Sequence, residues 1–272
     1  FNNYGTGDYS IKSGSSAIKA GTSVGLTTDL ENNSVPVNYP DIGAFQYPNN
    51  KYVLVNIKVL IEGLYDNGNC STYFNSHNLI PLSQPYHSYP WNYSGSESVS
   101  KIPSDVLDWI LVELRSTIAN YSIIARRAAF LKSDGSIVDL DGVSPLKFDN
   151  INYGNYYIVI KYNNAIETWS KEGGVLFSDT NISYDFTTSQ NQAYGNNLLK
   201  MENKWCIYSG DLNHNGIVDD DDYRSIENDN DLATYHIAND LNRDGVVDLS
   251  DLCIVYSNRS ANITRIIPPG AQ

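Results

Sequence analysis

Two twelve-residue segments of this chain repeat one spacing of oxygen-bearing side chains. The first runs from Asp211 to Asp222 and the second from Asp240 to Asp251, so their starts lie 29 positions apart. In both segments a carboxylate or amide side chain stands at positions 1, 3, 5, 9 and 12, and a glycine stands at position 6. This duplicated spacing restricts what the segments can fold into far more than the composition does.

The spacing is typical of a loop that encloses a hard divalent cation. Ca²⁺ takes about six to eight oxygen ligands, and a twelve-residue loop supplies them from positions 1, 3, 5 and 12, the carbonyl of position 7 and a water held by position 9. Glycine at position 6 permits the sharp turn. We therefore predict two bound Ca²⁺ ions. The ligands would be Asp211, Asn213, Asn215, Ile217 (backbone), Asp219 and Asp222 in the first loop, and Asp240, Asn242, Asp244, Val246 (backbone), Asp248 and Asp251 in the second.

The negative charge of the chain is concentrated in the same region. Residues 211–251 hold twelve acidic residues and two arginines, so about −10 of the formal net charge of −13 lies there. An acidic block is usually a solvated tail, but this one alternates with Gly, Asn and single apolar residues. The acidic balance excludes nucleic acid as a partner, because phosphate binding requires clustered Lys and Arg. No apolar run approaches the ~20 residues of a membrane span.

Each loop is followed by a short predicted helix, from Asp221 to about Asn228 and from Ser250 to about Ser257. No convincing helix precedes either loop. Apolar Val218 and Val247, at position 8, are expected to pair the two loops back to back, and His214 at position 4 is expected to face solvent. Over residues 210–260 this loop-then-helix pair resembles the duplicated calcium module of type I dockerins.

The resemblance implies a cohesin-like domain as a partner. In dockerins, loop positions 10 and 11 govern the choice of partner, and here they are Asp220-Asp221 and Leu249-Ser250. These pairs differ from the paired small hydroxyl residues common in that family, and they differ from each other. The alternative, which we favour, is that the ions fold a small module and clamp it to its neighbour.

Residues 51–209 have the pattern of β structure. Apolar residues alternate from Val53 to Ile61, and similar runs occur at 155–162 and 182–187. Residues 133–136 read as a turn between two apolar runs. Residues 106–115 fit a helix or a buried strand, and the β-branched content favours the strand. Several strands at short spacing predict a β-sandwich or jelly roll.

Residues 1–50 hold too few apolar residues for a core of their own. We expect short strands at Tyr9–Lys12 and Ile42–Tyr47. The stretches Ser16-Ala-Ile-Lys-Ala-Gly21 and Asp41-Ile-Gly-Ala-Phe45 resemble the terminal coil of right-handed parallel β-helix proteins. The resemblance implies a cap on solenoid rungs upstream of Phe1, with those rungs or another copy as the neighbour of this end. An irregular linker is the alternative.

Several stretches of residues 51–260 are similar to the C-terminal region of secreted, hemagglutinin-like surface proteins of Bacteroidetes-type bacteria. They include Leu79–Tyr86, Pro90–Val99, Trp109–Arg115, Ala125–Phe130, Ser133–Gly142 and Tyr184–Gly195. The resemblance implies an extracellular or cell-surface location, with secretion by the type IX route. The usual sorting tail of that route is not recognisable after Asn258, and residues 261–272 are interpreted as a C-terminal tail.

No catalytic motif stands out. The sequence contains no His-Glu-x-x-His, Cys-x-x-Cys, Gly-x-Ser-x-Gly or P-loop pattern. Asp139 and Asp141 could form a carboxylate pair, but in a turn-rich strand such groups are more often surface or turn acceptors. Arg126 and Arg127 lie among apolar residues, so one of them is expected to point inward to a carboxylate. We predict that this chain is not an enzyme and that any catalytic site lies upstream of Phe1.

An aromatic loop is the best candidate for a recognition surface. Its residues Tyr86, Tyr89, Trp91 and Tyr93 could stack on sugar rings in a glycan-binding site. The alternative, which we favour, is that these rings plug one end of the β domain.

The sequence therefore predicts a mainly β chain with four parts. These are a β-helix end (1–50), a β-sandwich (51–209), a dockerin-like calcium module (210–260) and a tail (261–272). The leading interpretation is a non-catalytic, calcium-stabilised C-terminal region of a secreted surface protein, with a structural, adhesive or assembly role. The rival is an ancillary region of a polysaccharide-degrading β-helix enzyme that docks to a cohesin-type scaffold.

Overall fold

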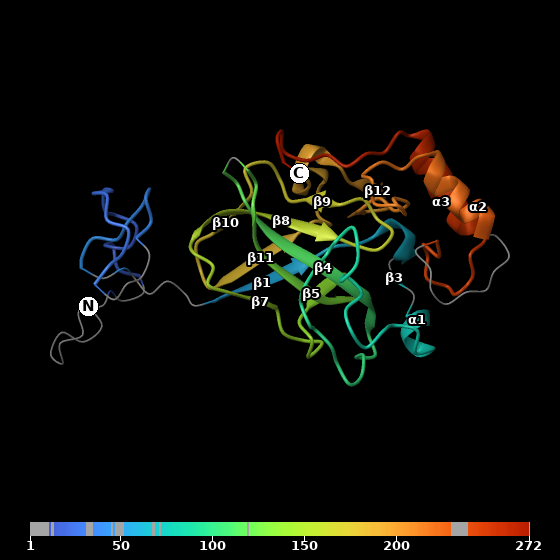
Figure 1. Ribbon diagram of the computed structural model, residues 1–272, viewed down its shortest axis with the longest axis horizontal. Coiled ribbons are helices and arrows are strands. Elements are labelled where there is room, and N and C mark those ends of the chain that lie inside the picture. The colour runs from blue at the N-terminus through green and yellow to red at the C-terminus, as the bar shows by residue number, and fades with distance from the viewer. Residues whose placement is uncertain are drawn as a thin grey trace. The chain divides into compact units, whose positions relative to one another are not determined.

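A nine-stranded β-sheet dominates the computed structural model of this protein (Figure 1). The structure describes residues 11, 14–30, 35–44, 46, 52–66, 69–70, 72–118, 120–229 and 239–271. The chain divides into two units, Phe1–Val53 with Asp149–Tyr153, and Leu54–Phe148 with Gly154–Gln272.

The strands of the sheet follow the order β10-β8-β4-β5-β6-β1-β11, with β7 beside β1 and β9 beside β8. The pairs β10–β8, β8–β4, β4–β5, β5–β6 and β6–β1 are antiparallel, and β1–β11 is parallel. The strands of this sheet are β1 (Tyr52–Lys58), β4 (Val106–Ser116), β5 (Ile123–Lys132), β6 (Ser136–Val138), β7 (Leu146–Asp149), β8 (Gly154–Lys161), β9 (Thr168–Trp169), β10 (Val175–Phe177) and β11 (Asn181–Asp185). The predicted mainly β fold is confirmed, and the two-sheet sandwich stays a prediction.

Smaller elements complete the second unit. Two further strand pairs are β2 (Tyr65–Asp66) with β3 (Asn69–Cys70) and β12 (Leu199–Met201) with β13 (Lys204–Cys206). The helices are α1 (Tyr73–Ser76), α2 (Asp220–Asp229) and α3 (Leu249–Ser260), with 3-10 turns η2 (Glu62–Leu64), η3 (Gln190–Gln192) and η4 (Tyr194–Asn196). None of the helices among the described residues has the length and apolar composition that a bilayer crossing requires.

Strand β4 is buried along both faces, which explains why its sequence lacks alternation. Every residue from Val106 to Arg115 is buried, so a layer covers each side of the strand. One of these layers is the segment 72–102. Its Pro81 carbonyl accepts a hydrogen bond from Trp109 Nε1 at 2.7 Å, and the Tyr86 hydroxyl donates to the Trp109 carbonyl at 2.8 Å. The preference for a strand over a helix at this site is confirmed.

A buried carboxylate on β4 organises the basic residues around it. Glu113 has no exposed surface. Its Oε2 lies 2.7 Å from Arg115 Nε, and its Oε1 lies 2.7 Å from Arg126 Nε. The neighbouring Arg127 pairs with Asp139 at 2.6 Å. The expectation that one arginine of the Arg126-Arg127 pair meets a carboxylate is thus confirmed for both.

The N-terminal unit joins the two stretches that the sequence singled out. Ile42 N donates to the Ala17 carbonyl at 2.9 Å, and Gly21 N donates to the Pro40 carbonyl at 2.8 Å. Residues 42–44 form bends, so the expected strand does not begin there. Most of the Tyr9–Lys12 strand, together with Phe45 and Tyr47, lies outside the described residues. The β-helix end stays a prediction.

The predicted helices after the two loops are confirmed as α2 and α3, which lie side by side (Figure 1). Asp248 begins α3 by accepting a hydrogen bond from Ser250 N at 2.7 Å, within a capping box that Asp251 completes. The apolar core between loops and helices contains Val218, Ile226, Leu241, Val247 and Val255, and Ile166 of the β domain packs into it.

The tail, and not the second loop, pairs with the backbone of the first loop. Val218 N donates to the Ile263 carbonyl at 2.9 Å, and Arg265 N donates to the Gly216 carbonyl at 2.7 Å. The expected pairing of the two loops through Val218 and Val247 holds for the side chains, which share one core. The backbone partner of Val218 is Ile263 of the tail. Further along, Ile267 packs on the aromatic cluster of the sheet domain. The tail thus ties the loop region to the sheet.

Candidate metal centre

In the first loop, side-chain oxygens accept hydrogen bonds from the backbone of the same loop. Asp222 Oδ1 accepts from Leu212 N at 2.8 Å and from Asn213 N at 3.2 Å, while its Oδ2 accepts from Asp219 N at 2.9 Å. Asp211 Oδ2 accepts from Gly216 N at 3.1 Å. These bonds close the loop around the oxygens of positions 1 and 12.

The second loop repeats this network position by position. Asp251 Oδ1 accepts from Leu241 N at 2.7 Å and from Asn242 N at 3.3 Å, and its Oδ2 accepts from Asp248 N at 3.0 Å. Asp240 Oδ2 accepts from Gly245 N at 2.9 Å. The duplication seen in the sequence is therefore a duplication of geometry.

The two glycines at position 6 have the backbone conformation that the spacing predicted. Gly216 has φ 88° and Gly245 has φ 90°, which lies in the left-handed region that favours glycine. A Cβ on Gly245 would also stand 2.4 Å from the ring of Tyr73. The second loop therefore needs glycine both for its turn and for its contact with α1.

The carboxylates at positions 1 and 12 are buried with little to balance their charge. Asp211, Asp222, Asp240 and Asp251 are each at most 3% exposed. Burial raises the pKa of Asp211 to about 7, with the Asp222 carboxylate adding to the shift, and burial raises the pKa of Asp240 to about 6. Asp211 Oδ1 is buried and has no hydrogen-bond partner. A buried charge of this kind is costly unless a cation pairs with it, so these residues fit a divalent metal.

Among the described residues, no three His, Cys, Asp or Glu side chains gather into a preformed metal cluster. The predicted donor set accounts for part of this, because Asn213, Asn215 and the carbonyl of Ile217 supply half of the first loop's ligands. The carboxylate oxygens are, in addition, held by backbone N–H groups. Calcium binding thus stays a prediction that the burial and the loop geometry favour.

Arg243, at position 4 of the second loop, attaches the loop to the sheet domain. It is 6% exposed, and its Nη2 lies 2.7 Å from Asp108 Oδ2 on β4. Its Nε donates to the Tyr162 hydroxyl at 3.2 Å, which itself donates to Asp108 Oδ2 at 3.0 Å. The guanidinium also lies 4.7 Å from the ring centroid of Phe74. Sequence reasoning missed this residue, whose partner is 135 residues away.

His214, at position 4 of the first loop, is covered as well. Its ring centroid lies 4.5 Å from that of Trp91, and burial lowers its pKa to about 4. The expectation that His214 faces solvent is wrong, because the aromatic loop lies over it. Position 4 therefore carries a contact with the β domain in both loops.

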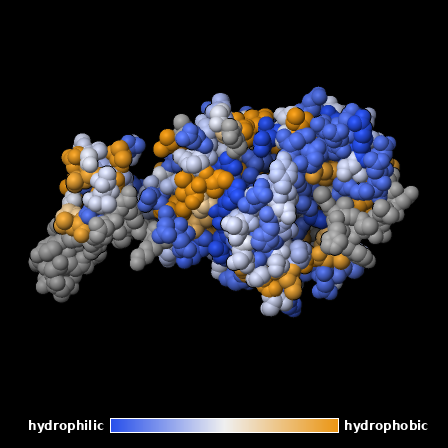
Figure 2. Space-filling view, viewed as in Figure 1, coloured by the Kyte–Doolittle hydropathy of each residue, from blue (hydrophilic) through white to orange (hydrophobic). Residues whose placement is uncertain are grey.

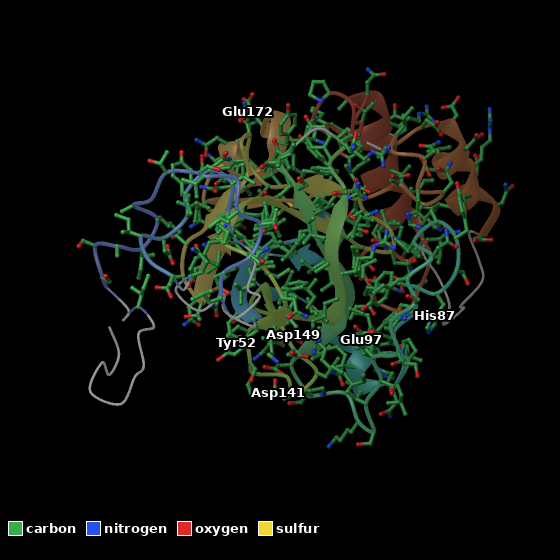
Figure 3. All side chains as sticks on the ribbon, turned by 60° about the vertical axis from the view of Figure 1, so that its left-hand side comes forward. Tyr52, His87, Glu97, Asp141, Asp149 and Glu172 are labelled. Carbon is green, nitrogen blue, oxygen red and sulfur yellow. The ribbon has the colours of Figure 1, made fainter. Side chains whose placement is uncertain are left out.

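We expect His214→Ala to lower the free energy of unfolding by about 1 kcal/mol, since it removes the ring contact with Trp91. The change should also alter the tryptophan fluorescence of the native protein. His87→Ala is the matched control, because His87 is exposed on the same aromatic loop (Figure 3) and should change neither quantity. Equal effects of the two substitutions in urea denaturation would contradict the role of the contact.

The four rings of the aromatic loop have different surroundings. Tyr86 is 1% exposed and Tyr93 is 9% exposed, and both belong to the core beside β4. Tyr93 donates a hydrogen bond from its hydroxyl to Glu97. Trp91 is half-buried, while Tyr89 is 81% exposed. The buried pair fills the domain, as the alternative interpretation predicts, so glycan recognition stays a prediction for Trp91 and Tyr89.

Asp139 and Asp141 do not act together. Asp139 pairs with Arg127, whereas Asp141 Oδ1 accepts hydrogen bonds from Val143 N at 2.9 Å and Ser144 N at 2.8 Å in the loop before β7 (Figure 3). This arrangement confirms the expectation of a turn acceptor for Asp141.

No family model and no curated protein matches this sequence. A chain from the crystal structure of a type II cohesin–X-dockerin complex of Acetivibrio cellulolyticus, a C-terminal interface mutant, is 12% identical, with a TM-score of 0.41, covering 76% of this chain and 95% of that chain. A chain from the N-terminal interface mutant is 14% identical, with a TM-score of 0.38, covering 78% and 95%. Such scores identify neither a family nor a function.

Proposed function

We propose that this chain is the non-catalytic, calcium-stabilised C-terminal region of a secreted surface protein. In this proposal a duplicated calcium-loop module folds around two Ca²⁺ ions and is held to a β domain. Its role is structural or adhesive, or it assembles the larger protein at the cell surface.

The observation that carries the proposal is the repeated hydrogen-bond network of the two loops around buried carboxylates. Asp222 and Asp251 each accept hydrogen bonds from the backbone N–H groups of positions 2, 3 and 9 of their own loop. Two unrelated acidic turns would not share this pattern. Arg243 and His214 supply the attachment to the β domain from the same position of each loop. Together these features favour ions that fold and hold a module, with no reaction required of it.

A calcium titration of the whole chain tests this proposal. Isothermal calorimetry should count two sites, and Asp222→Ala and Asp251→Ala should each remove one, because each deletes the position-12 ligand of a loop. Asp221→Ala is the matched control: Asp221 is exposed at position 11 and makes only surface contacts with Arg224, so two sites should remain. A chain that binds no calcium, or keeps two sites in both ligand variants, would contradict the proposal.

A second candidate function is docking to a cohesin-like domain. The exposed side chains of Leu249 (66%) and Tyr256 (54%) favour it, because they place apolar surface on α3 in a region that is otherwise largely hydrophilic (Figure 2). Capture of the chain by a purified cohesin module, lost on Leu249→Asp, would support docking. No capture across a panel of cohesins would leave the structural role as the better proposal.

A further inference from the structure

The first loop contains a chemically reactive pair of residues, Asn215-Gly216. An asparagine followed by glycine can cyclise, because glycine has no Cβ to obstruct the approach of its backbone nitrogen to the side-chain amide. The sequence has two such pairs, and the other, Asn67-Gly68, lies outside the described residues. Asn215 stands at position 5 of the loop and is exposed to solvent.

Hydrogen bonds restrain both reacting groups in the folded loop. Asn215 Oδ1 accepts a hydrogen bond from Ile217 N at 2.8 Å, which fixes the side-chain amide. Gly216 N donates to Asp211 Oδ2 at 3.1 Å, and the Gly216 carbonyl accepts from Arg265 N at 2.7 Å. The backbone nitrogen that must attack is therefore already engaged inside the loop. Cyclisation requires these bonds to break, so it proceeds from a locally opened loop.

The second loop shows that the folded geometry accepts a product of this reaction. Asp244 takes the place of Asn215 at position 5, again before a glycine. Its Oδ1 accepts a hydrogen bond from Val246 N at 2.9 Å, just as Asn215 Oδ1 accepts from Ile217 N. A carboxylate at position 5 thus fits this loop, and it would add one negative charge to the ligand set of the first loop. Ligand charge is one of the properties that set the calcium affinity of such loops.

We propose that Asn215 deamidates spontaneously and irreversibly, and that calcium bound in the first loop slows the reaction. Gly216 N attacks Asn215 Cγ, the Cγ–Nδ2 bond breaks, and ammonia leaves with the proton of Gly216 N. Water then opens the cyclic imide by breaking one of the two bonds from a carbonyl carbon to Gly216 N. Opening at Cγ gives aspartate, whereas opening at the backbone carbonyl carbon gives isoaspartate. The calcium dependence rests on the proposed function.

The two products have opposite effects on the first loop. Aspartate reproduces position 5 of the second loop and should tighten calcium binding. Isoaspartate inserts a methylene into the backbone directly before Gly216. It therefore displaces the N–H that donates to Asp211 and the carbonyl that accepts from Arg265. A chain kept without calcium accumulates first loops that either bind the ion more tightly or no longer close.

Peptide mapping by mass spectrometry, on the whole chain incubated in calcium or in chelator, measures the conversion of Asn215. A ligand that binds only the closed loop lowers the open fraction about a hundredfold at one hundred times its dissociation constant, so conversion should be at least about tenfold faster in chelator. Asn213 is the internal control. It is exposed in the same loop and its Oδ1 accepts from Asn215 N at 2.9 Å, but histidine follows it, so it should stay an amide in both conditions.

Two variants test whether the ion of the first loop gives the protection. Asp222→Ala removes the position-12 ligand of that loop, so Asn215 should convert in calcium as fast as it does in chelator. Asp251→Ala is the matched control, because it removes the same ligand from the second loop and should leave the conversion slow. Equal conversion of Asn215 in the two variants would overturn the proposal.

Calorimetry on the same samples separates this proposal from the calcium role on which it rests. Two calcium sites, with equal conversion of Asn215 in calcium and in chelator, would overturn the deamidation proposal alone. A chain that binds no calcium would overturn the proposed function, and the calcium dependence with it, while Asn215 would still react faster than Asn213. Asn215→Asp carries the aspartate product from the start. Its first site should bind calcium more tightly than that of the unmodified chain, and weaker binding would contradict the effect assigned to this product.

Discussion

Removal of calcium should lower the thermal unfolding midpoint of this chain by roughly 10–20 °C. A ligand that binds only the folded state stabilises it by about 2.7 kcal/mol at a concentration one hundred times its dissociation constant, and two sites would contribute about twice that. For a domain of this size each kcal/mol corresponds to about 2–4 °C.

The physical reason lies in the four buried carboxylates at positions 1 and 12 of the loops. Without an ion, burial and the neighbouring Asp222 raise the pKa of Asp211, and burial and Asp251 raise the pKa of Asp240, so keeping these groups ionised costs free energy. The module core is small and depends on the loops for the placement of Val218 and Val247. Losing the ions should therefore release the core as well as the loops.

The loss of stability on calcium removal should extend to the β domain. Ile166 packs into the module core, and Arg243 is buried against β4. Tryptophan fluorescence, to which the fully buried Trp109 of β4 contributes, should therefore follow the same transition as the far-ultraviolet circular dichroism. Magnesium is the control, because its smaller shell demands near-ideal octahedral geometry. Identical midpoints in calcium and in chelator would contradict the expectation.

Patterns of residues close in sequence predicted most of the helices and strands. The strand preference at 106–115, the strands beginning near 52 and 155, and the two helices after the loops all depend on residues close in sequence, and the structure has each of them. Loop geometry was also predictable, because the spacing of Asp, Asn and Gly in a twelve-residue loop fixes which backbone groups its oxygens can reach.

What could not be predicted are the long-range partners. Nothing near Arg243 or His214 in the sequence shows that Asp108 or Trp91 will lie against them. The hydrogen bond from Val218 N to the Ile263 carbonyl is a further long-range partner of this kind. Such choices depend on how whole elements pack together.

Arg243→Met should destabilise the chain by about 3–5 kcal/mol, which is large for a residue outside the predicted ligand set. Removing one partner of a buried ion pair leaves the other charge without compensation, and this costs far more than the pair itself contributes. Asp108 would retain hydrogen bonds from Trp109 N at 2.8 Å and from the Tyr162 hydroxyl, but it would lose its cation. Urea denaturation followed by tryptophan fluorescence measures the change.

Arg224→Met is the matched control. Arg224 is also an arginine of the module, but its side chain is 63% exposed and its nearest carboxylates lie at 3.5 and 3.9 Å. Surface ion pairs of this kind contribute about 0–1 kcal/mol. If the two methionine variants lost similar stability, Arg243 would not be the attachment between the loop and the sheet.

A double substitution separates the ion pair from the packing around it. Replacing Asp108 by leucine in the Arg243→Met background removes the uncompensated charge, so it should restore part of the lost stability. The recovery should be incomplete, because Trp109 N and the Tyr162 hydroxyl lose their acceptor. Calorimetry on the same variants should still count two calcium sites, because position 4 supplies no ligand to the ion. Partly restored stability with two calcium sites would show that Arg243 joins the module to the β domain independently of metal binding. A calcium site lost with Arg243 would instead mean that the attachment and the metal site are one structure.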